Sequence, residues 1–362
     1  MIRNQLERII MREDNRRMLR QILRFQSLIH NGIEDSEQYL ETYRLTERAE
    51  NLGRDGLISI AWFGMGASAL IGEYIASYLL YASTTNNSII IDIYRDVPRK
   101  HLLRRPYDIY IFYSYSGNTA ETLKAFDFIR QQGNIRRNAL VITFSTGGQL
   151  KILARKEGVP HIKLIERYVS RSHFPYGLSI AFSIIARILG LKQELHELQN
   201  AQVEKFIKSL ESKDMCQNLK KLAEKLLGKI AIITAEKILE PVARRFIAQF
   251  NENAKHFAVY FEVPEGAHNF IVGLRGLNRN KALNIVLRRN SEDEFVGRYL
   301  DTILSKIAGI ESYELRIPDR KFSWETLLIP TVFADILSVM LADIKNLSAF
   351  DIEEIAMIKK EL

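Results

Sequence analysis

The sequence predicts an α/β fold with two halves of similar size, each a parallel sheet flanked by helices, preceded by an N-terminal helical arm. Two observations predict this class. Short, nearly continuous apolar runs alternate with helical patterns, which is typical of parallel strands buried on both faces. The alternation stops near Leu191 and restarts near Lys229, with a charged helical stretch between. The length of 362 residues suits two or three domains.

The N-terminal arm, residues 1–55, is expected to be helical. Its charged residues are interrupted by apolar ones three or four positions apart, such as Leu6, Ile9 and Ile10. This spacing places apolar side chains on one helix face, which predicts helices packed on something larger.

The first half, residues 56–195, contains expected strands separated by helical patterns. The strands are residues 57–63, 89–94, 109–113 and 139–144, and the helices are residues 69–81, 120–131 and 149–157. This order predicts a parallel sheet covered by helices on both faces.

A charged helical connector, residues 196–225, leads into the second half, residues 226–345. The expected strands are residues 229–235, 258–263, 282–287 and 313–317, and the expected helices are residues 240–250, 292–308 and 324–345. A last helix is expected within residues 346–362. The most apolar stretches, residues 64–83 and 178–191, are interrupted by charges before the roughly 18 residues that a membrane span needs, so no membrane partner is expected.

The composition indicates a folded protein of a reducing compartment. Hydrophobic residues make up 47% and charged residues 26%, which excludes a mostly disordered or collagen-like chain. Cys216 is the only cysteine, so an intrachain disulfide and a cysteine-built zinc site are excluded, and a cytoplasmic location is expected. The histidines lack ligand spacing, so neither a metal nor another cofactor is expected.

The net charge of +8 favours anionic partners. Phosphate esters, nucleic acids and acidic lipids would all fit this charge. Nucleic-acid binding is not expected, because the sequence shows no basic stripe interleaved with aromatic residues and no recognition motif.

The strongest functional signal is SYSGNTAET at residues 114–122, which follows an expected strand and opens an expected helix. The first turn of a helix presents unpaired N–H groups and partial positive charge, which favour an anion. The hydroxyl groups of Ser114, Ser116 and Thr119 add donors, and Gly117 lets the backbone approach a ligand. Without a Walker lysine, the turn predicts a small phosphate monoester. The alternative interpretation is an ordinary helix cap and tight turn.

A second polar turn, residues 64–68, follows the first expected strand. It is not a dinucleotide fingerprint, since Ala69 replaces the third glycine and no ribose-binding acid follows a second strand. Because ligands bind at the carboxyl ends of parallel strands, Gly66 and Ser68 are candidates for the same phosphate site.

These residues resemble the sugar isomerase (SIS) domain, a flavodoxin-like unit that binds phosphosugars. Two further motifs, NENAK at residues 251–255 and PEGAHN at residues 264–269, and Arg171 resemble the archaeal bifunctional phosphoglucose/phosphomannose isomerase family. The resemblance covers about residues 55–362. It implies two SIS subdomains and an obligate homodimer whose sites are shared between subunits.

The resemblance also implies roles in isomerising a hexose 6-phosphate. Glu252 would be the base that moves a proton between C1 and C2, and Arg171 would face the enediolate. His268, from the partner subunit, would help to open the sugar ring, and Lys359 on the last helix would assist. The phosphate would be held by Gly66, Ser68, Ser114, Ser116 and Thr119.

The chemistry of this reaction calls for these residue types. A carboxylate can take a proton from one carbon and return it to the next. A fixed cation stabilises the enediolate charge, and a histidine can exchange the ring-opening proton near neutral pH. Glutamate, arginine and histidine meet these needs without a metal.

Departures from the family pattern bear on the substrate. Ala67 and Ala69 stand where the family tends to have glycine, and Ile352 and Glu353 stand where it usually has a Thr-Pro pair. That threonine is associated with handling mannose 6-phosphate. The sequence therefore favours isomerisation of glucose 6-phosphate and fructose 6-phosphate and leaves mannose 6-phosphate open. Two alternatives are an isomerase of another phosphosugar and a non-catalytic phosphosugar-binding protein.

Overall fold

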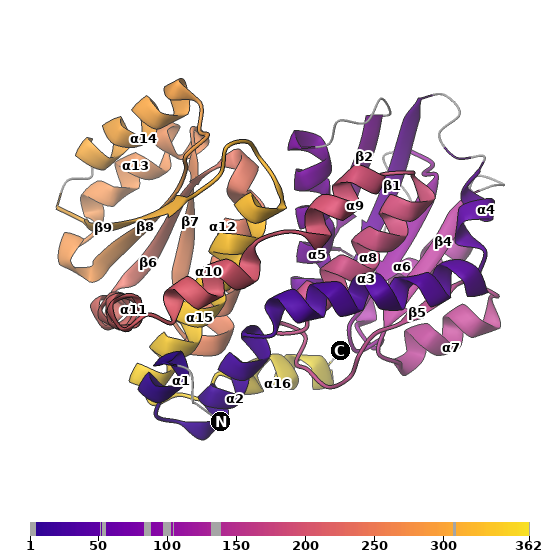
Figure 1. Ribbon diagram of the computed structural model, residues 1–362, viewed down its shortest axis with the longest axis horizontal. Coiled ribbons are helices and arrows are strands. Elements are labelled where there is room, and N and C mark those ends of the chain that lie inside the picture. The colour runs from indigo at the N-terminus through magenta and orange to yellow at the C-terminus, as the bar shows by residue number, and fades with distance from the viewer. Residues whose placement is uncertain are drawn as a thin grey trace. The chain divides into compact units, whose positions relative to one another are not determined.

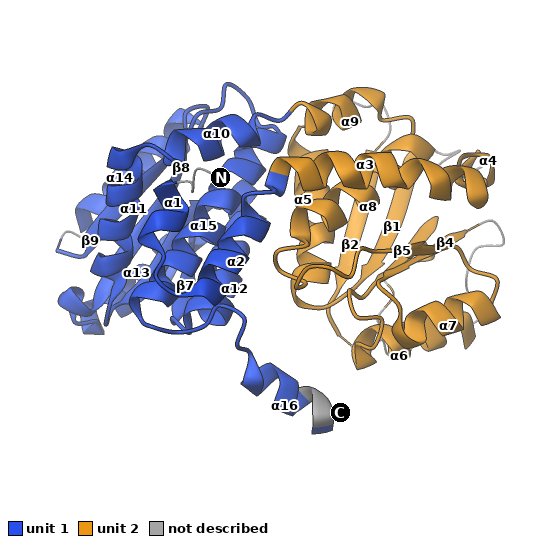
Figure 2. Cartoon of the chain, turned by 60° about the horizontal axis from the view of Figure 1, so that its bottom comes forward, with its two compact units in different colours: residues 1–25, 201–362 blue, residues 26–200 orange. Residues whose placement is uncertain are grey.

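The computed structural model describes residues 5–50, 52, 56–82, 88–96, 103, 105–131, 139–306 and 309–361. The chain divides into two compact units, coloured separately in Figure 2. Unit 2 comprises residues 26–200, and unit 1 comprises residues 1–25 and 201–362. Each unit contains a parallel sheet flanked by helices, so the predicted α/β class is confirmed.

The sheet of unit 2 has the strand order β2-β1-β3-β4-β5, which is the flavodoxin-like order (Figure 1). Every residue of β3 and β4 is buried, as expected of central strands covered on both faces. The register pairs Phe63 with Phe112, and their rings stack at 4.8 Å. The strands are β1 (Leu57–Phe63), β2 (Ser88–Tyr94), β3 (Ile109–Tyr113), β4 (Leu140–Ser145) and β5 (His161–Lys163).

Helices of unit 2 include two that the sequence placed in the N-terminal arm, α3 and α4. Helix α3 approaches α8 closely, since a Cβ on Gly32 would lie 2.1 Å from Ser179 Oγ. The buried hydroxyls of Ser36 and Ser183 bond at 2.7 Å across the same contact. The helices are α3 (Phe25–Thr42), α4 (Leu45–Ala49), α5 (Gly66–Tyr81), α6 (Ala120–Gln131), α7 (Gly148–Lys156), α8 (Phe174–Ile188) and α9 (Lys192–Gln199).

The sheet of unit 1 has the strand order β7-β6-β8-β9, and all its neighbouring strands are parallel. All eight residues of β8 are buried, and a buried hydrogen bond of 2.7 Å joins Thr234 Oγ1 on β6 to Asn284 Oδ1 on β8. The strands are β6 (Ile230–Glu236), β7 (Ala258–Val263), β8 (Ala282–Arg289) and β9 (Glu311–Ile317).

Helix α15 forms the core of unit 1. It is long and apolar enough to cross a membrane, which corrects the expectation that residues 64–83 and 178–191 are the most apolar stretches. Its most apolar window is 94% buried inside the structure, as is usual for a core helix. The guanidinium of Arg245 on α12 bonds to the Asp335 carboxylate on α15 at 2.8 Å, and both side chains are buried. The helices of unit 1 are α1 (Gln5–Ile9), α2 (Glu13–Ile22), α10 (Val203–Leu210), α11 (Lys213–Leu226), α12 (Glu240–Ala254), α13 (Phe270–Gly273), α14 (Glu294–Lys306), α15 (Trp324–Ile344) and α16 (Glu353–Glu361).

The beginning of the chain is fixed to the end of α15. The carboxylate of Asp343 accepts hydrogen bonds from the Met11 and Arg12 N–H groups at 2.7 and 2.9 Å. Asn15 is buried, donates to the Leu347 carbonyl at 3.0 Å and accepts from the Ala349 N–H at 2.9 Å. Helix α2 is therefore held in unit 1 by specific polar contacts as well as by apolar packing.

Candidate functional site

Three neighbouring strands of unit 2 end in polar turns at the same edge of the sheet. Strand β1 lies beside β3, and β3 beside β4, so the turns that follow them are adjacent. The first two turns, residues 64–68 and 114–119, are together called the cradle below. The ends of β1 and β3 come so close that a Cβ on Gly64 would lie 3.0 Å from the Tyr113 carbonyl oxygen.

The hydroxyl groups of the second cradle turn bond to one another. Ser114 Oγ donates to Thr119 Oγ1 at 2.9 Å and accepts from the Gly117 N–H at 3.1 Å. Ser114 is buried, whereas Thr119 is half-buried and Ser116 is exposed. Ser114 therefore braces the turn internally, and Ser116 and Thr119 are the hydroxyls open to a ligand.

The first cradle turn is joined to the second by Ser68. Its Oγ accepts from the Tyr115 N–H at 3.4 Å, and Ser68 itself is largely buried. Gly66 is exposed and begins α5 with φ of +51°, a left-handed conformation that glycine adopts without strain. The structure thus brings Gly66, Ser68, Ser114, Ser116 and Thr119 together at one sheet edge.

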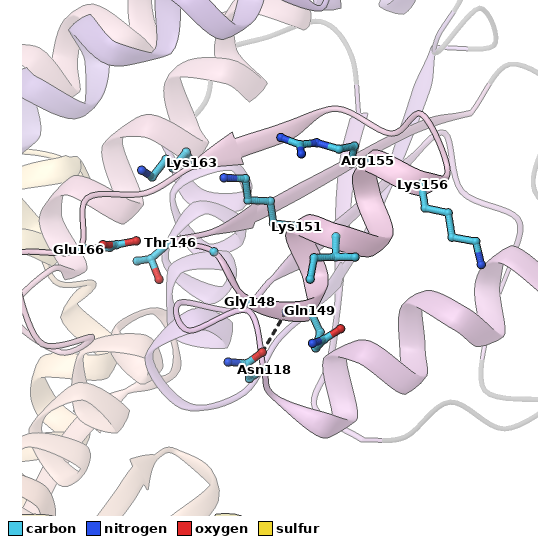
Figure 3. A pocket seen from close by; sticks show the side chains of 11 residues that line it. Asn118, Thr146, Gly148, Gln149, Lys151, Arg155, Lys156, Lys163 and Glu166 are labelled. Atoms are coloured by element: carbon cyan, nitrogen blue, oxygen red, sulfur yellow. Dashed lines mark hydrogen bonds between the residues drawn. The ribbon is translucent and has the colours of Figure 1, made fainter.

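A third turn, residues 146–149 after β4, was not among the sequence-based predictions. The Thr146 N–H donates to the Tyr115 carbonyl at 2.8 Å, and the Gln149 N–H donates to Asn118 Oδ1 at 2.9 Å (Figure 3). The signal was present, because Ser-Thr-Gly-Gly stands between an expected strand and an expected helix, as in the other two turns. This third turn fixes the cradle from the side of α7.

Tyr115 connects the cradle to the loop that carries Arg171. Its hydroxyl donates to the carbonyls of Ile165, at 3.3 Å, and of Tyr168. Burial raises the pKa of Tyr115 to about 12, so the hydroxyl stays protonated and keeps donating at neutral pH. Arg171 is 2% exposed, three residues beyond Tyr168. A buried cation thus stands on a loop that is bonded directly to the cradle.

Glu252 lies in the last turn of α12 in unit 1 and is half-buried. The next residues end the helix, with Lys255 in a left-handed conformation at φ of +45°. The Lys255 ammonium donates to the carbonyls of Glu252, Ser348 and Asp351 at 3.2, 2.7 and 2.5 Å. This lysine therefore caps α12 and ties the helix end to the segment that leads into α16.

Lys359 lies on α16, which begins at Glu353, and its side chain is outside the described residues. Ile352 and Glu353 come at the start of this helix, directly after Asp351, whose carbonyl accepts from Lys255. The end of α12 and the start of α16 are therefore joined within unit 1.

His268 ends a short 3-10 helix, residues 265–268, that follows β7, and it is exposed. Glu252 precedes β7 and His268 follows it, so the two residues lie toward opposite ends of this strand. Six residues of β-strand span about 20 Å. His268 is therefore remote from Glu252 of its own chain.

The arrangement offers hydrogen-bond donors for an anion in unit 2 and the half-buried Glu252 at the end of α12 in unit 1. Among the described residues, no group of three or more His, Cys, Asp or Glu side chains is placed to hold a metal ion. The chemistry available from these side chains is anion binding, charge stabilisation by a cation and proton transfer by a carboxylate.

Comparisons show that this chain is similar to proteins named for reactions of phosphosugars. Residues 217–362 match the model of the bacterial phospho-glucose isomerase C-terminal SIS domain. A D-glucosamine-6-phosphate 4-epimerase of Sulfolobus acidocaldarius is 29% identical over 83% of this chain and 87% of its own length. A bifunctional phosphoglucose/phosphomannose isomerase of Aquifex aeolicus is 27% identical over 84% of this chain and 90% of its own length.

Solved structures agree on the fold. The C-terminal domain of glucosamine-fructose-6-phosphate aminotransferase from Francisella tularensis superposes with a TM-score of 0.63 at 15% identity, covering 91% of this chain and 96% of that one. The resemblance to the bifunctional phosphoglucose/phosphomannose isomerase family, expected from the sequence motifs, is confirmed by the family model and by the curated relatives.

Proposed function

We propose that this chain isomerises a hexose 6-phosphate between its aldose and ketose forms, with glucose 6-phosphate and fructose 6-phosphate as the pair. The observation that carries the proposal is the cradle, where Ser114 holds the Thr119 hydroxyl at 2.9 Å at the start of α6, beside the exposed Ser116. Such a group of hydroxyls at a helix start suits a phosphate monoester. Similarity to isomerases of hexose phosphates supports the choice of substrate.

Glu252 is the base in this proposal. It takes the proton from C2 of the open-chain aldose and returns a proton to C1, which gives the ketose through an enediol. The buried Arg171 stabilises negative charge on the enediolate oxygens, because a fixed cation in a site poor in water acts most strongly on charge that develops in the transition state. Lys359 assists ring opening from α16.

His268 completes the site from the partner subunit. The residue is exposed, and it lies toward the opposite end of β7 from Glu252 of its own chain. Ring opening needs a proton donor and acceptor near neutral pH, which suits histidine. The proposal therefore includes a homodimer in which each site uses residues of both chains.

The test is formation of fructose 6-phosphate from glucose 6-phosphate by the purified chain, compared with Glu252→Gln. We expect Glu252→Gln to lower kcat by about a hundredfold or more with little change in sugar-phosphate affinity, since the amide keeps the shape but cannot accept the proton. Glu224→Gln, at an exposed glutamate near the end of α11, is the matched control and keeps full activity. Full turnover by Glu252→Gln would refute the assignment of the base.

A second candidate is epimerisation of an aminohexose 6-phosphate. It is favoured by the similarity to the D-glucosamine-6-phosphate 4-epimerase and by Ile352 at the position where the isomerases usually have threonine. Incubation with glucosamine 6-phosphate, with products resolved by chromatography, separates the two candidates. Conversion of glucosamine 6-phosphate by a chain that forms no fructose 6-phosphate from glucose 6-phosphate would favour the epimerase. Binding of both sugars without turnover would favour a sensor.

A further inference from the structure

A hollow of about 840 Å³ lies beside the cradle within unit 2 (Figure 3). It is bounded by the turn at residues 146–149, by one side of α7 along its length and by the end of β5. Asn118 of the cradle also lines it. The hollow is therefore next to the proposed phosphate position but is formed mostly by other elements.

The hollow is lined by cations whose charged groups extend to one side. Lys151 and Arg155 on α7 and Lys163 at the end of β5 extend their charged groups in the same direction, whereas Lys156 points away (Figure 3). The nearby Glu157 forms its ion pair with Arg130 at 2.8 Å. In the part of the chain that the structure describes, no carboxylate forms an ion pair with Lys151, Arg155 or Lys163.

Two of these cations lower the pKa of a neighbouring histidine. The pKa of His161 is lowered to about 4, first by burial and then by the positive charges of Lys151 and Arg155. Glu166 is the only acidic residue that lines the hollow within the described chain. One carboxylate against these three cations leaves a positive potential that an anion would neutralise.

We propose that this hollow is a second anion site, which binds a ligand carrying two linked phosphate groups. A single phosphate monoester carries at most two negative charges, and the cradle already offers a place for one. A diphosphate carries about three charges near neutral pH, and its oxygens can bond to Lys151, Arg155 and Lys163 together. Inorganic pyrophosphate and the diphosphate of a nucleotide share this chemistry. The site does not rest on the proposed isomerase activity.

The hollow is coupled to the cradle through backbone contacts. The Leu150 N–H donates to the Gly117 carbonyl at 2.9 Å, in addition to the bond between Gln149 and Asn118. Gly148 is packed so tightly that a Cβ there would lie 2.5 Å from the Ser116 carbonyl oxygen. A ligand that orders the turn at residues 146–149 would therefore also order the cradle.

The experiment is calorimetric titration of the full chain with pyrophosphate in magnesium-free buffer. We expect saturable binding that weakens as salt is raised, because the contacts are ionic. The double variant Lys151→Ala/Arg155→Ala should bind at least about tenfold more weakly, since two charge-assisted hydrogen bonds are lost. Lys124→Ala/Lys192→Ala is the matched control: both residues are exposed in unit 2, neither lines the hollow, and the loss of charge is the same.

A third variant separates the hollow from the cradle. Ser116→Ala/Thr119→Ala should weaken the binding of a hexose 6-phosphate and leave pyrophosphate affinity within about twofold. Loss of pyrophosphate binding in this variant would overturn the proposal by placing the ligand in the cradle. Equal affinity of the wild type and Lys151→Ala/Arg155→Ala, or no binding at millimolar pyrophosphate, would also overturn it. Binding of ADP more tightly than pyrophosphate would support the site and identify a nucleotide.

Discussion

Gly117 shows how a single residue sets the shape of the cradle. Its φ of +72° lies in the left-handed region, and a Cβ there would lie 1.9 Å from the Gly147 carbonyl oxygen. Because that oxygen belongs to the backbone of a neighbouring turn, it cannot rotate away as a side chain would. Both the dihedral angle and the contact therefore require glycine.

We expect Gly117→Ala to destabilise the chain by about 3 kcal/mol or more and to abolish binding of the hexose phosphate, because the two turns must separate. Gly158→Ala is the matched control, since Gly158 has φ of +64° but open space around a Cβ, and it should cost only about 1–2 kcal/mol. Urea unfolding and calorimetry measure the two effects. Equal losses of stability in both variants would show that the contact with Gly147 is unimportant.

At the residue scale, the sequence predicted the position of site residues best where one short segment contained several indicative residue types. The hydroxyls and glycine of residues 114–119 stand between a strand and a helix, so their edge position followed from sequence alone. The hydrogen bond between Ser114 and Thr119 did not, because it depends on how the turn closes. Nor could sequence show that Ser114 is buried and Ser116 exposed.

At the scale of elements, the apolar runs predicted the longer strands well. Residues 57–63 and 109–113 are strands as expected, and α12 continues to Ala254, four residues beyond the expected end. Strand β5 has three residues, too few to show a pattern, and it was missed. The arm helices have apolar faces, but periodicity does not say what covers them: α3 packs on α8, whereas α2 is held by Asp343 of α15.

Helix α8 begins beside a buried neutral histidine, which makes stability depend on pH. Burial lowers the pKa of His173 to about 3, and its ring packs between those of Tyr115 and Tyr176 at 4.8 and 5.0 Å. The folded-state pKa lies below the unfolded value of about 6.5. As the pH falls from about 6.5 to about 3, the unfolded state therefore binds a proton that the folded state excludes, and stability is lost.

We expect the free energy of unfolding of the wild type to fall over this range, with His173 contributing up to about 1.4 kcal/mol per pH unit. His173→Phe keeps the ring packing and should make the fall shallower by about that amount, with no change of slope above pH 7. His196→Phe, at an exposed histidine on α9, is the control. Urea unfolding at a series of pH values gives the slopes; identical slopes for the wild type and His173→Phe would contradict the assignment.

At the scale of the whole molecule, the proposed chemistry is divided between the two units and between two chains. The cradle and Arg171 belong to unit 2, whereas Glu252, His268 and α16 belong to unit 1. Motif order along the sequence could indicate the participants, because each motif is local. The sequence also predicted a strand at 258–263 between Glu252 and His268, but it could not show that β7 is an edge strand of its sheet, because strand order depends on packing.

The separation of Glu252 from His268 within one chain predicts that two inactive variants regain activity when they are paired in one dimer. A heterodimer of Glu252→Gln and His268→Ala chains, purified through two different tags, contains one site with Glu252 from one chain and His268 from the other. In a two-fold symmetric dimer with shared sites, this heterodimer should recover about half of the wild-type activity, although each variant homodimer is nearly inactive. The coupled assay for fructose 6-phosphate measures the recovery.

The matched control pairs a wild-type chain with a chain that carries both substitutions. This control carries the same two substitutions as the first heterodimer. Every shared site in it lacks either Glu252 or His268, so we expect almost no activity. If the two residues instead acted within one chain, the results would be reversed: the control would keep about half of the activity, and the first heterodimer would be nearly inactive. The comparison therefore decides which chain supplies the histidine, because both heterodimers contain the same substitutions and differ only in their distribution.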